Sequence, residues 1–169
     1  MEVQTVRPRI KPTLTSLDKW IEILGWVLLI FLWWETLRFY PGLPETIPVH
    51  YGLNGAVDAY GSKRMMLTLP TIASILFAGI TVVNQFPHIF NYPVRITEEN
   101  APKQYAAATR LLRYIKLIIL VVFGFIESKT ILNISTGSNH IGAWFFPITM
   151  SLIFIPILIY IFISKRTVS

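Results

Sequence analysis

The chain has no cysteine among its 169 residues, and only 14% of them are charged. The first absence excludes disulfide bonds and thiolate metal ligands. The second excludes a soluble domain of this length, because such a domain needs a charged surface, whereas 53% of these residues are hydrophobic. The sequence also has no HExxH, serine-elbow or phosphate-loop motif. Composition therefore predicts a membrane protein without a common hydrolase or nucleotide-binding signature.

Long apolar runs predict the architecture. The hydrocarbon core of a bilayer is roughly 30 Å thick, so a spanning helix needs about 20 apolar residues. We predict an all-α membrane protein with four transmembrane helices, both termini cytoplasmic, and a folded external cap between the first two helices. The predicted segments are a cytoplasmic segment 1–19, helix 20–39, the external cap 40–66, helix 67–86, a cytoplasmic segment 87–110, helix 111–126, an external loop 127–140, helix 141–163 and a cytoplasmic tail 164–169.

The distribution of basic residues predicts the orientation. In this topology eleven Lys and Arg residues lie on the cytoplasmic side and four on the outside, as the positive-inside rule requires. The net charge of +6 then reflects orientation and contact with anionic lipid headgroups rather than nucleic-acid binding. A basic cytoplasmic stripe at three-residue spacing is interpreted as a headgroup anchor, in preference to a docking face for a cytoplasmic protein; its members are Arg110, Arg113 and Lys116.

Ionisable residues are scarce inside the predicted spans. Glu22 and Glu35 lie near the two ends of the first span, and the centres of the third and fourth spans carry no charge. Secondary transporters and proton relays normally need ionisable groups within the membrane. This pattern argues against a self-contained transporter.

The external cap contains the stretch LPETIPVHYGLNGAVDAYGSK, which is rich in turn-forming residues. The tripeptide Leu-Asn-Gly predicts a hairpin turn in which Gly55 adopts a positive φ angle. A three-residue turn places Tyr51 opposite Val57 and His50 opposite Asp58, so that the last two side chains share one face and touch. A two-residue turn would instead send Asp58 to the other face.

The same stretch fills the pattern L-P-x-x-I-P-x-H-[FY]-x-x-x-G-x-x-D-x-x-G-x-K. The matching residues, which we call the cap motif, are Leu43, Pro44, Ile47, Pro48, His50, Tyr51, Gly55, Asp58, Gly61 and Lys63. On this motif the chain resembles domain-of-unknown-function family 1648, a bacterial membrane family that also forms the N-terminal half of the immunity protein of the sporulation-delay toxin system. The stretch NYPVRITEENAPKQYAAATRLLRYIK is similar to the cytoplasmic segment of many members.

This resemblance implies a multi-pass protein of the bacterial inner (cytoplasmic) membrane. In the best understood relatives it implies protection from a secreted antimicrobial peptide and a relay to a cytoplasmic repressor. Those immunity proteins are longer and carry a further multi-span region. We therefore expect the fold and topology to transfer to this chain rather than the immunity role.

The predicted contact between His50 and Asp58 has two interpretations. The favoured one is structural, because an aspartate in a tight turn commonly braces it. The alternative is a metal or catalytic site, because a histidine oriented by a carboxylate is a common part of such sites. His140, or Glu127 at the start of the second external loop, would then supply a third ligand, conceivably to zinc. No cofactor is otherwise expected.

Three function hypotheses follow. The first is a membrane binding protein, related to toxin immunity or envelope sensing, whose external cap contacts a peptide or protein ligand and whose cytoplasmic side contacts a partner protein. The second is a membrane enzyme or metal-binding protein that uses His50, Asp58 and His140. The third is an accessory subunit of a membrane complex. An enzyme is the less favoured class, the lipid bilayer is the one certain partner, and the oligomeric state is left open.

Overall fold

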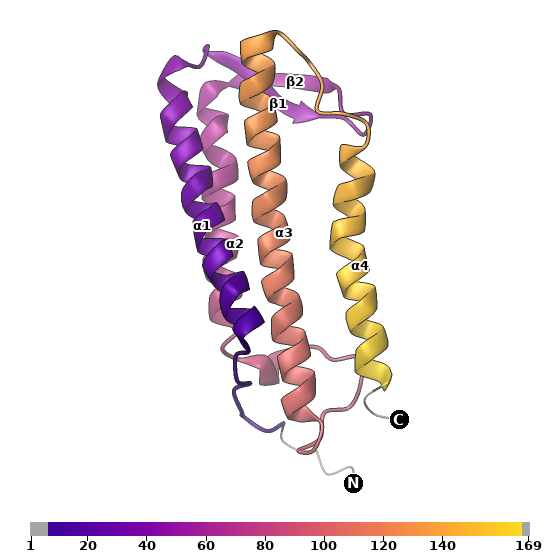
Figure 1. Cartoon of the computed structure of the whole chain (residues 1–169). Helices are drawn as coiled ribbons and strands as arrows, with labels where there is room; N and C mark the ends of the chain where they lie inside the picture. The colour runs from indigo at the N-terminus through magenta and orange to yellow at the C-terminus, as the bar shows by residue number, and fades with distance from the viewer. Residues whose placement is uncertain (1–6, 167–169) are drawn as a thin grey trace.

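The computed structural model describes residues 7–166 and is mostly helical (Figure 1). Four helices are long and apolar enough, with their flanking turns, to cross a membrane. They are α1 (Ser16–Phe39), α2 (Thr68–Val83), α3 (Ala101–Thr136) and α4 (Phe145–Arg166). The four predicted apolar spans are therefore confirmed. Parts of the two predicted terminal segments, residues 1–6 and 167–169, lie outside the described residues.

Helix α3 is the central element of the bundle, with α1 and α2 packed on one side and α4 on the other (Figure 1). The first three helices enclose an apolar core of Leu29, Leu32, Ala73, Phe77 and Leu120. Large apolar side chains outside this core stay exposed on all four helices. An exterior of this kind is what a lipid bilayer would cover.

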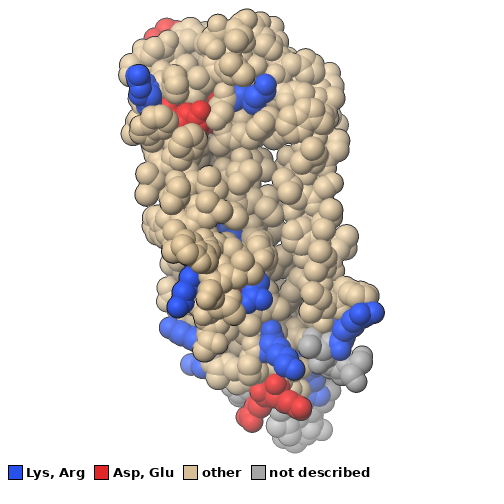
Figure 2. Space-filling model, viewed as in Figure 1, with Lys and Arg blue, Asp and Glu red and all other residues tan. Residues whose placement is uncertain are grey.

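The two ends of the bundle differ. Helix α1 begins and α4 ends at one end, which we call the terminal end, and a β-hairpin crosses the opposite end, which we call the cap end (Figure 1). Charged side chains gather towards both ends, and the face between them in this view carries few Lys, Arg, Asp or Glu residues (Figure 2). The charge distribution agrees with a bundle that spans a bilayer.

Helix α3 is longer than the predicted third span. It starts at Ala101, within the predicted cytoplasmic segment 87–110, and runs into the span without a break. It then continues beyond Ile126 to Thr136, so most of the predicted external loop 127–140 is helical instead.

The reason for this extension lies in the polar residues beyond the apolar run. Glu127, Thr130 and Asn133 recur at three-residue spacing and are all buried, so they form an inward face of the helix rather than a solvated loop. The helix ends at Gly137, which adopts the left-handed conformation with φ 72° that glycine readily provides at a C-terminus.

Helix α1 begins before the predicted position 20. Thr15 and Asp18 form a capping box, in which each side chain accepts a hydrogen bond from the backbone N–H of the other residue. This box satisfies two otherwise unpaired donors and fixes the helix start at Ser16.

Helices α2 and α4 are shorter than the predicted spans 67–86 and 141–163 at one end each. Helix α2 ends at Val83, shortly before Pro87, because the residue before a proline disfavours the helical conformation. Helix α4 begins at Phe145 because Gly142 has φ 99°, outside the helical region.

The cap contains two antiparallel strands, β1 (Thr46–Tyr51) and β2 (Val57–Ser62). The predicted all-α class is therefore corrected to a mostly helical protein with a two-stranded sheet. The turn between the strands has the predicted three-residue form, since the Gly52 N–H donates to the Ala56 carbonyl at 2.8 Å. Gly55 has the predicted positive φ, 80°.

The hairpin is fixed to the bundle by packing and by backbone pairing. Leu43, Ile47 and Met66 form a second buried cluster, and Ile131 and Ile134 of α3 pack against it. The segment after α3 also pairs with the hairpin, through hydrogen bonds from Val57 N–H to the Asn139 carbonyl at 2.9 Å and from Ile141 N–H to the Gly55 carbonyl at 2.8 Å. The cap is thus held on two sides.

Candidate functional site

Most residues of the cap motif serve the packing of the hairpin. Leu43 and Ile47 are buried in its apolar cluster, and Pro48 is buried in β1. Gly61 faces Val49 so closely that an added Cβ would lie 3.1 Å from its methyl group. These residues are explained by the fold.

Gly55 is the most constrained position of the turn. A Cβ added there would lie 2.5 Å from the carbonyl oxygen of Gly142, and its positive φ disfavours any other residue. Gly55 therefore fixes the turn and also lets the segment before α4 approach it.

Lys63 forms an ion pair with Glu45 at 2.8 Å and lies over the ring of Tyr40, 5.8 Å from its centroid. The hydrogen bond from Lys63 lowers the pKa of the Glu45 carboxyl below its ordinary value. Because Glu45 is 83% exposed, this pair orders the surface of the cap and adds little stability.

His50 and Asp58 are in contact, as predicted, with 2.5 Å between Nδ1 and Oδ1. The predicted pairing is only partly correct. Tyr51 does pair with Val57, but two bulges follow, and His50 pairs with Ala59 while Asp58 is the extra residue. An unpaired residue in a bulge can point in a different direction from its regularly paired neighbours. Asp58 therefore reaches His50 although His50 pairs with Ala59.

The pair is exposed, with 68% of the His50 side chain and 50% of the Asp58 side chain accessible. An exposed pair of this kind is worth about 0.2 to 1 kcal/mol. The packing of the hairpin does not require it, in contrast to the motif residues that are buried or in close backbone contact, namely Leu43, Ile47, Pro48, Gly55 and Gly61.

His140 comes close to the hairpin through its backbone, which forms a bridge with Ala56. Its carbonyl accepts a hydrogen bond from Asn133 Nδ2 at 3.2 Å. Among residues 7–166, no group of three or more His, Cys, Asp or Glu side chains is arranged to hold a metal ion. The His50–Asp58 pair is thus the part of the predicted metal site that the structure brings together.

The predicted basic stripe contacts carboxylates of α1 in the structure. Arg110 donates to Asp18 at 2.8 Å, and Lys116 donates to Glu22 at 2.6 Å and to Thr81 at 2.9 Å. The Arg110 side chain is 32% exposed, whereas that of Lys116 is only 2% exposed. The interpretation as a headgroup anchor is therefore corrected for Lys116, which lies in the α1–α3 interface.

The third member of the stripe behaves in the same way. Arg113 Nε lies 3.1 Å from Glu22 Oε1, an ion pair whose alignment falls short of a hydrogen bond. We call Asp18, Glu22, Arg110, Arg113 and Lys116 the terminal-end layer.

A second polar cluster, which the sequence did not reveal as a site, lies further along the same two helices towards the cap end. Glu35 accepts a hydrogen bond from Ser128 at 2.8 Å, and Thr36 is in short contact with Glu127. We call these four residues the cap-end layer. Glu127, which the sequence suggests only as a possible third metal ligand in a loop, is fully buried. Buried ionisable groups therefore exist in the bundle, contrary to the pattern inferred from the sequence.

Hydrogen bonds connect this part of α3 to the hairpin. The hydroxyl of Tyr51 lies 2.9 Å from that of Thr130, and Asn133 Nδ2 donates to the Tyr51 hydroxyl at 3.4 Å. Thr130 itself donates to the Ile126 carbonyl at 2.8 Å, so Tyr51 is the donor to Thr130. Tyr51 of the cap motif thus couples the cap to α3.

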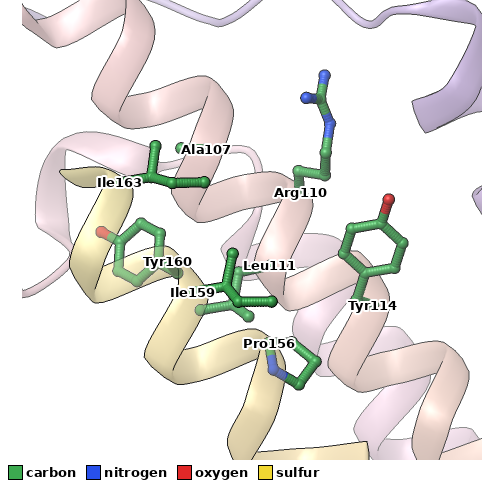
Figure 3. A pocket seen from close by; sticks show the side chains of 8 residues that line it. All are labelled: Ala107, Arg110, Leu111, Tyr114, Pro156, Ile159, Tyr160 and Ile163. Atoms are coloured by element: carbon green, nitrogen blue, oxygen red, sulfur yellow. The ribbon is translucent and has the colours of Figure 1, made fainter. Parts of the chain in front are cut away.

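An apolar groove of about 380 Å³ lies between α3 and α4 near the terminal end (Figure 3). Pro156 and Tyr160 of α4 line one side, and Leu111 and Tyr114 of α3 line the other. The guanidinium of Arg110 points away from the α4 wall (Figure 3) and towards Asp18. The groove therefore offers an apolar surface of the kind that lipid chains cover.

Fold and site together define a multi-pass membrane-type protein with a hairpin cap and two polar layers inside the bundle. Residues 19–73 match the family described as "Domain of unknown function (DUF1648)", which confirms the resemblance over α1, the cap and the start of α2. The chain is also similar to an "Uncharacterized protein" of Archaeoglobus fulgidus, 27% identical over 159 residues that cover 87% of each chain. No solved structure matches.

Proposed function

We propose that this protein is a multi-pass membrane protein that binds a peptide or protein ligand through its cap hairpin on the outer side of the bacterial inner membrane. The observation that carries the proposal is that the residues of the cap motif fall into two groups, those that pack the hairpin against the bundle and those that stay exposed. Most of its residues hold the hairpin on the bundle, whereas His50 and Asp58 stay exposed at its surface.

The rigidity of the hairpin supports a binding role. Its strands are fixed by a buried cluster, by the segment after α3 and by the hydroxyl of Tyr51. A surface that is already ordered loses little conformational entropy when a ligand binds. On the same hairpin, Leu53 of the turn is 72% exposed and Tyr60 of β2 is 55% exposed, and such side chains supply apolar contact area.

The outward orientation of the cap rests on the positive-inside rule. Eleven of the fifteen Lys and Arg residues belong to segments at the terminal end, and four belong to segments at the cap end. The orientation is testable with single cysteines, because the natural chain has none. Leu53→Cys should react with an impermeant thiol reagent in intact cells, and Lys103→Cys should react only after the membrane is opened. The reverse pattern would contradict the outward cap.

The binding role is tested by recovery of a ligand from native membranes. Wild type and a matched surface variant, Glu98→Gln, should recover the same ligand, and His50→Ala and Asp58→Ala should lose it. The melting temperatures of the two cap variants should stay close to wild type, because the exposed pair contributes at most about 1 kcal/mol. Equal recovery by all four proteins would contradict a ligand contact at this pair.

Two alternatives predict different results. A metal-binding protein or enzyme that uses His50, Asp58 and His140 should be stabilised by zinc in wild type and not in His50→Ala. An accessory subunit should co-purify with a partner that His50→Ala and Asp58→Ala retain. A cytoplasmic partner would be lost instead on changing exposed residues of the terminal end, such as Lys103.

A further inference from the structure

We infer that Glu35 and Glu127, with the hydroxyls of Thr36 and Ser128, form a binding site for one monovalent cation, either a proton or an alkali metal ion. The site lies at the α1–α3 interface on the cap side of the apolar core. It is separate from the cap surface and does not depend on the proposed ligand binding.

The first argument is burial without a counter-charge. Glu127 is fully buried and Glu35 is 8% exposed. They belong to one cluster, because Ser128, next to Glu127 in the chain, donates to Glu35, and Thr36, next to Glu35, contacts Glu127. Among residues 7–166, no Lys, Arg or His forms an ion pair with either of them. Two neighbouring carboxylates in a medium of low dielectric constant cannot both stay ionised. A positive charge must therefore come from outside the chain.

The second argument is an unpaired oxygen. Oε2 of Glu127 has neither solvent access nor a hydrogen-bond partner among the described residues. A buried carboxylate oxygen without a partner costs several kcal/mol. A bound proton or a metal ion in contact with this oxygen removes that cost.

The third argument counts hydrogens. The hydroxyl of Thr36 lies 2.8 Å from the Leu32 carbonyl and in short contact with Oε1 of Glu127. A hydroxyl has one hydrogen. If it is donated to the Leu32 carbonyl, the contact with Glu127 needs a hydrogen on the carboxyl group or a cation beside the two oxygens that offsets their repulsion.

The nearby contact of the cap has no such shortage. Asn133 donates to Tyr51, Tyr51 donates to Thr130, and Thr130 donates to the Ile126 carbonyl. Each hydroxyl in this chain gives its hydrogen once. The missing hydrogen therefore concerns only the contact between Thr36 and Glu127, and these are the residues that would hold the cation.

The other titratable groups at this end are accounted for. On the cap, His50 pairs with Asp58 and Glu45 pairs with Lys63, and the Tyr51 hydroxyl binds Thr130. The remaining ones are Tyr40, Tyr60, Arg38 of α1, Arg64 after β2, Lys129 of α3 and His140, and none of them forms an ion pair with a described residue. A dependence on pH that disappears in Glu127→Gln can therefore be assigned to the cap-end layer.

The test measures the melting temperature of the purified full-length protein in detergent. One series varies pH without alkali metal ions, and a second compares sodium chloride with N-methylglucamine chloride at equal ionic strength and alkaline pH. The variants are Glu127→Gln and Glu35→Gln, whose amides keep the shape of the side chain. The matched control is Glu98→Gln, an exposed glutamate outside the bundle.

A proton site predicts that wild type loses stability relative to Glu127→Gln as pH rises, by up to tenfold in the folding equilibrium per pH unit. A metal site predicts that sodium raises the melting temperature of wild type and of Glu98→Gln, but of neither site variant. Parallel behaviour of wild type and the site variants in both series would overturn the inference. If the variants do not fold, a wild-type melting temperature that is independent of both pH and sodium would overturn it equally.

Discussion

The two polar layers between α1 and α3 handle negative charge in opposite ways. In the terminal-end layer, Glu22 is within ion-pair distance of both Arg113 and Lys116. In the cap-end layer, Glu35 and Glu127 contact hydroxyl groups, and neither forms an ion pair with a Lys, Arg or His among the described residues. The comparison teaches that a buried carboxylate in an apolar bundle needs either a charge from the chain or one from the surroundings. Ion pairs within the chain hold α1 and α3 together at the terminal-end layer. At the cap-end layer, the inferred cation site would make the stability of the α1–α3 interface depend on pH or on the concentration of the cation.

Removing the shared carboxylate of the terminal-end layer should have the largest effect. Glu22→Gln deletes the anion that both Arg113 and Lys116 contact, and the side chains of these two cations are 7% and 2% exposed. Breaking a buried ion pair typically costs about 3 to 5 kcal/mol, because a buried charge is left without its partner. We expect a loss of that order in the free energy of unfolding, measured by denaturant unfolding in detergent.

The matched control for this loss is the triple variant Glu22→Gln/Arg113→Gln/Lys116→Met, in which none of the three charges remains. It should be clearly more stable than Glu22→Gln alone. If the triple variant is as unstable as the single one, the loss reflects packing, and the two layers would not differ in the way described.

Disrupting the cap should have the next largest effect, because the cap covers the end of the bundle that carries Glu35 and Glu127. Gly55→Val places a β-branched residue at φ 80° and against the backbone of Gly142, at a cost of at least about 1 to 2 kcal/mol. We expect a lower melting temperature and faster proteolysis of the hairpin. Gly124→Ala is the control, because nothing lies within 4 Å of its added Cβ, and it should not destabilise the protein.

Removing the hydrogen bonds between the cap and α3 should lower the free energy of unfolding by a smaller amount. Tyr51→Phe removes the hydroxyl that donates to Thr130 and accepts from Asn133, and a net loss of about 0.5 to 1.5 kcal/mol is typical for such a bond. Tyr60→Phe removes an exposed hydroxyl bound to Asn139 and should cost less. Equal losses in the two variants would remove the special role of Tyr51.

The smallest effect is expected at the surface pair of Glu45 and Lys63. The hydrogen bond from Lys63 lowers the pKa of Glu45 from its ordinary value of 4.5. The carboxylate therefore adds stability above pH 4.5, and this contribution is lost as the pH falls through the lowered folded-state value. The difference in melting temperature between wild type and Glu45→Gln should shrink on acidification from pH 7. A difference that grows would contradict the pairing.

Much of the fold could be predicted from apolar length and turn chemistry. Four apolar runs predict four spans, and Leu-Asn-Gly predicts the turn and the positive φ of Gly55. The end of α3 was missed because Glu127, Ser128 and Lys129 resemble a membrane boundary in sequence. The spacing of Glu127, Thr130 and Asn133 was the available signal, since polar residues three apart form one helical face.

The candidate site was less predictable, because it depends on which residues meet across helices. The contact between His50 and Asp58 followed from the turn, although a bulge changed the pairing that produces it. The stripe of basic residues was visible in sequence, but its burial against Glu22 depends on how α1 and α3 face each other. Periodicity along one helix does not specify the partner on another.

The most direct test of the contrast between the two layers is infrared spectroscopy of the purified protein at neutral pH in a buffer free of alkali metal ions. Under these conditions a proton is the cation available to the cap-end layer. The account predicts an absorption band of a protonated carboxylic acid in wild type that disappears in Glu127→Gln and persists in Glu98→Gln. A wild-type spectrum without such a band would show that both Glu35 and Glu127 stay ionised without a bound cation, and would contradict the account.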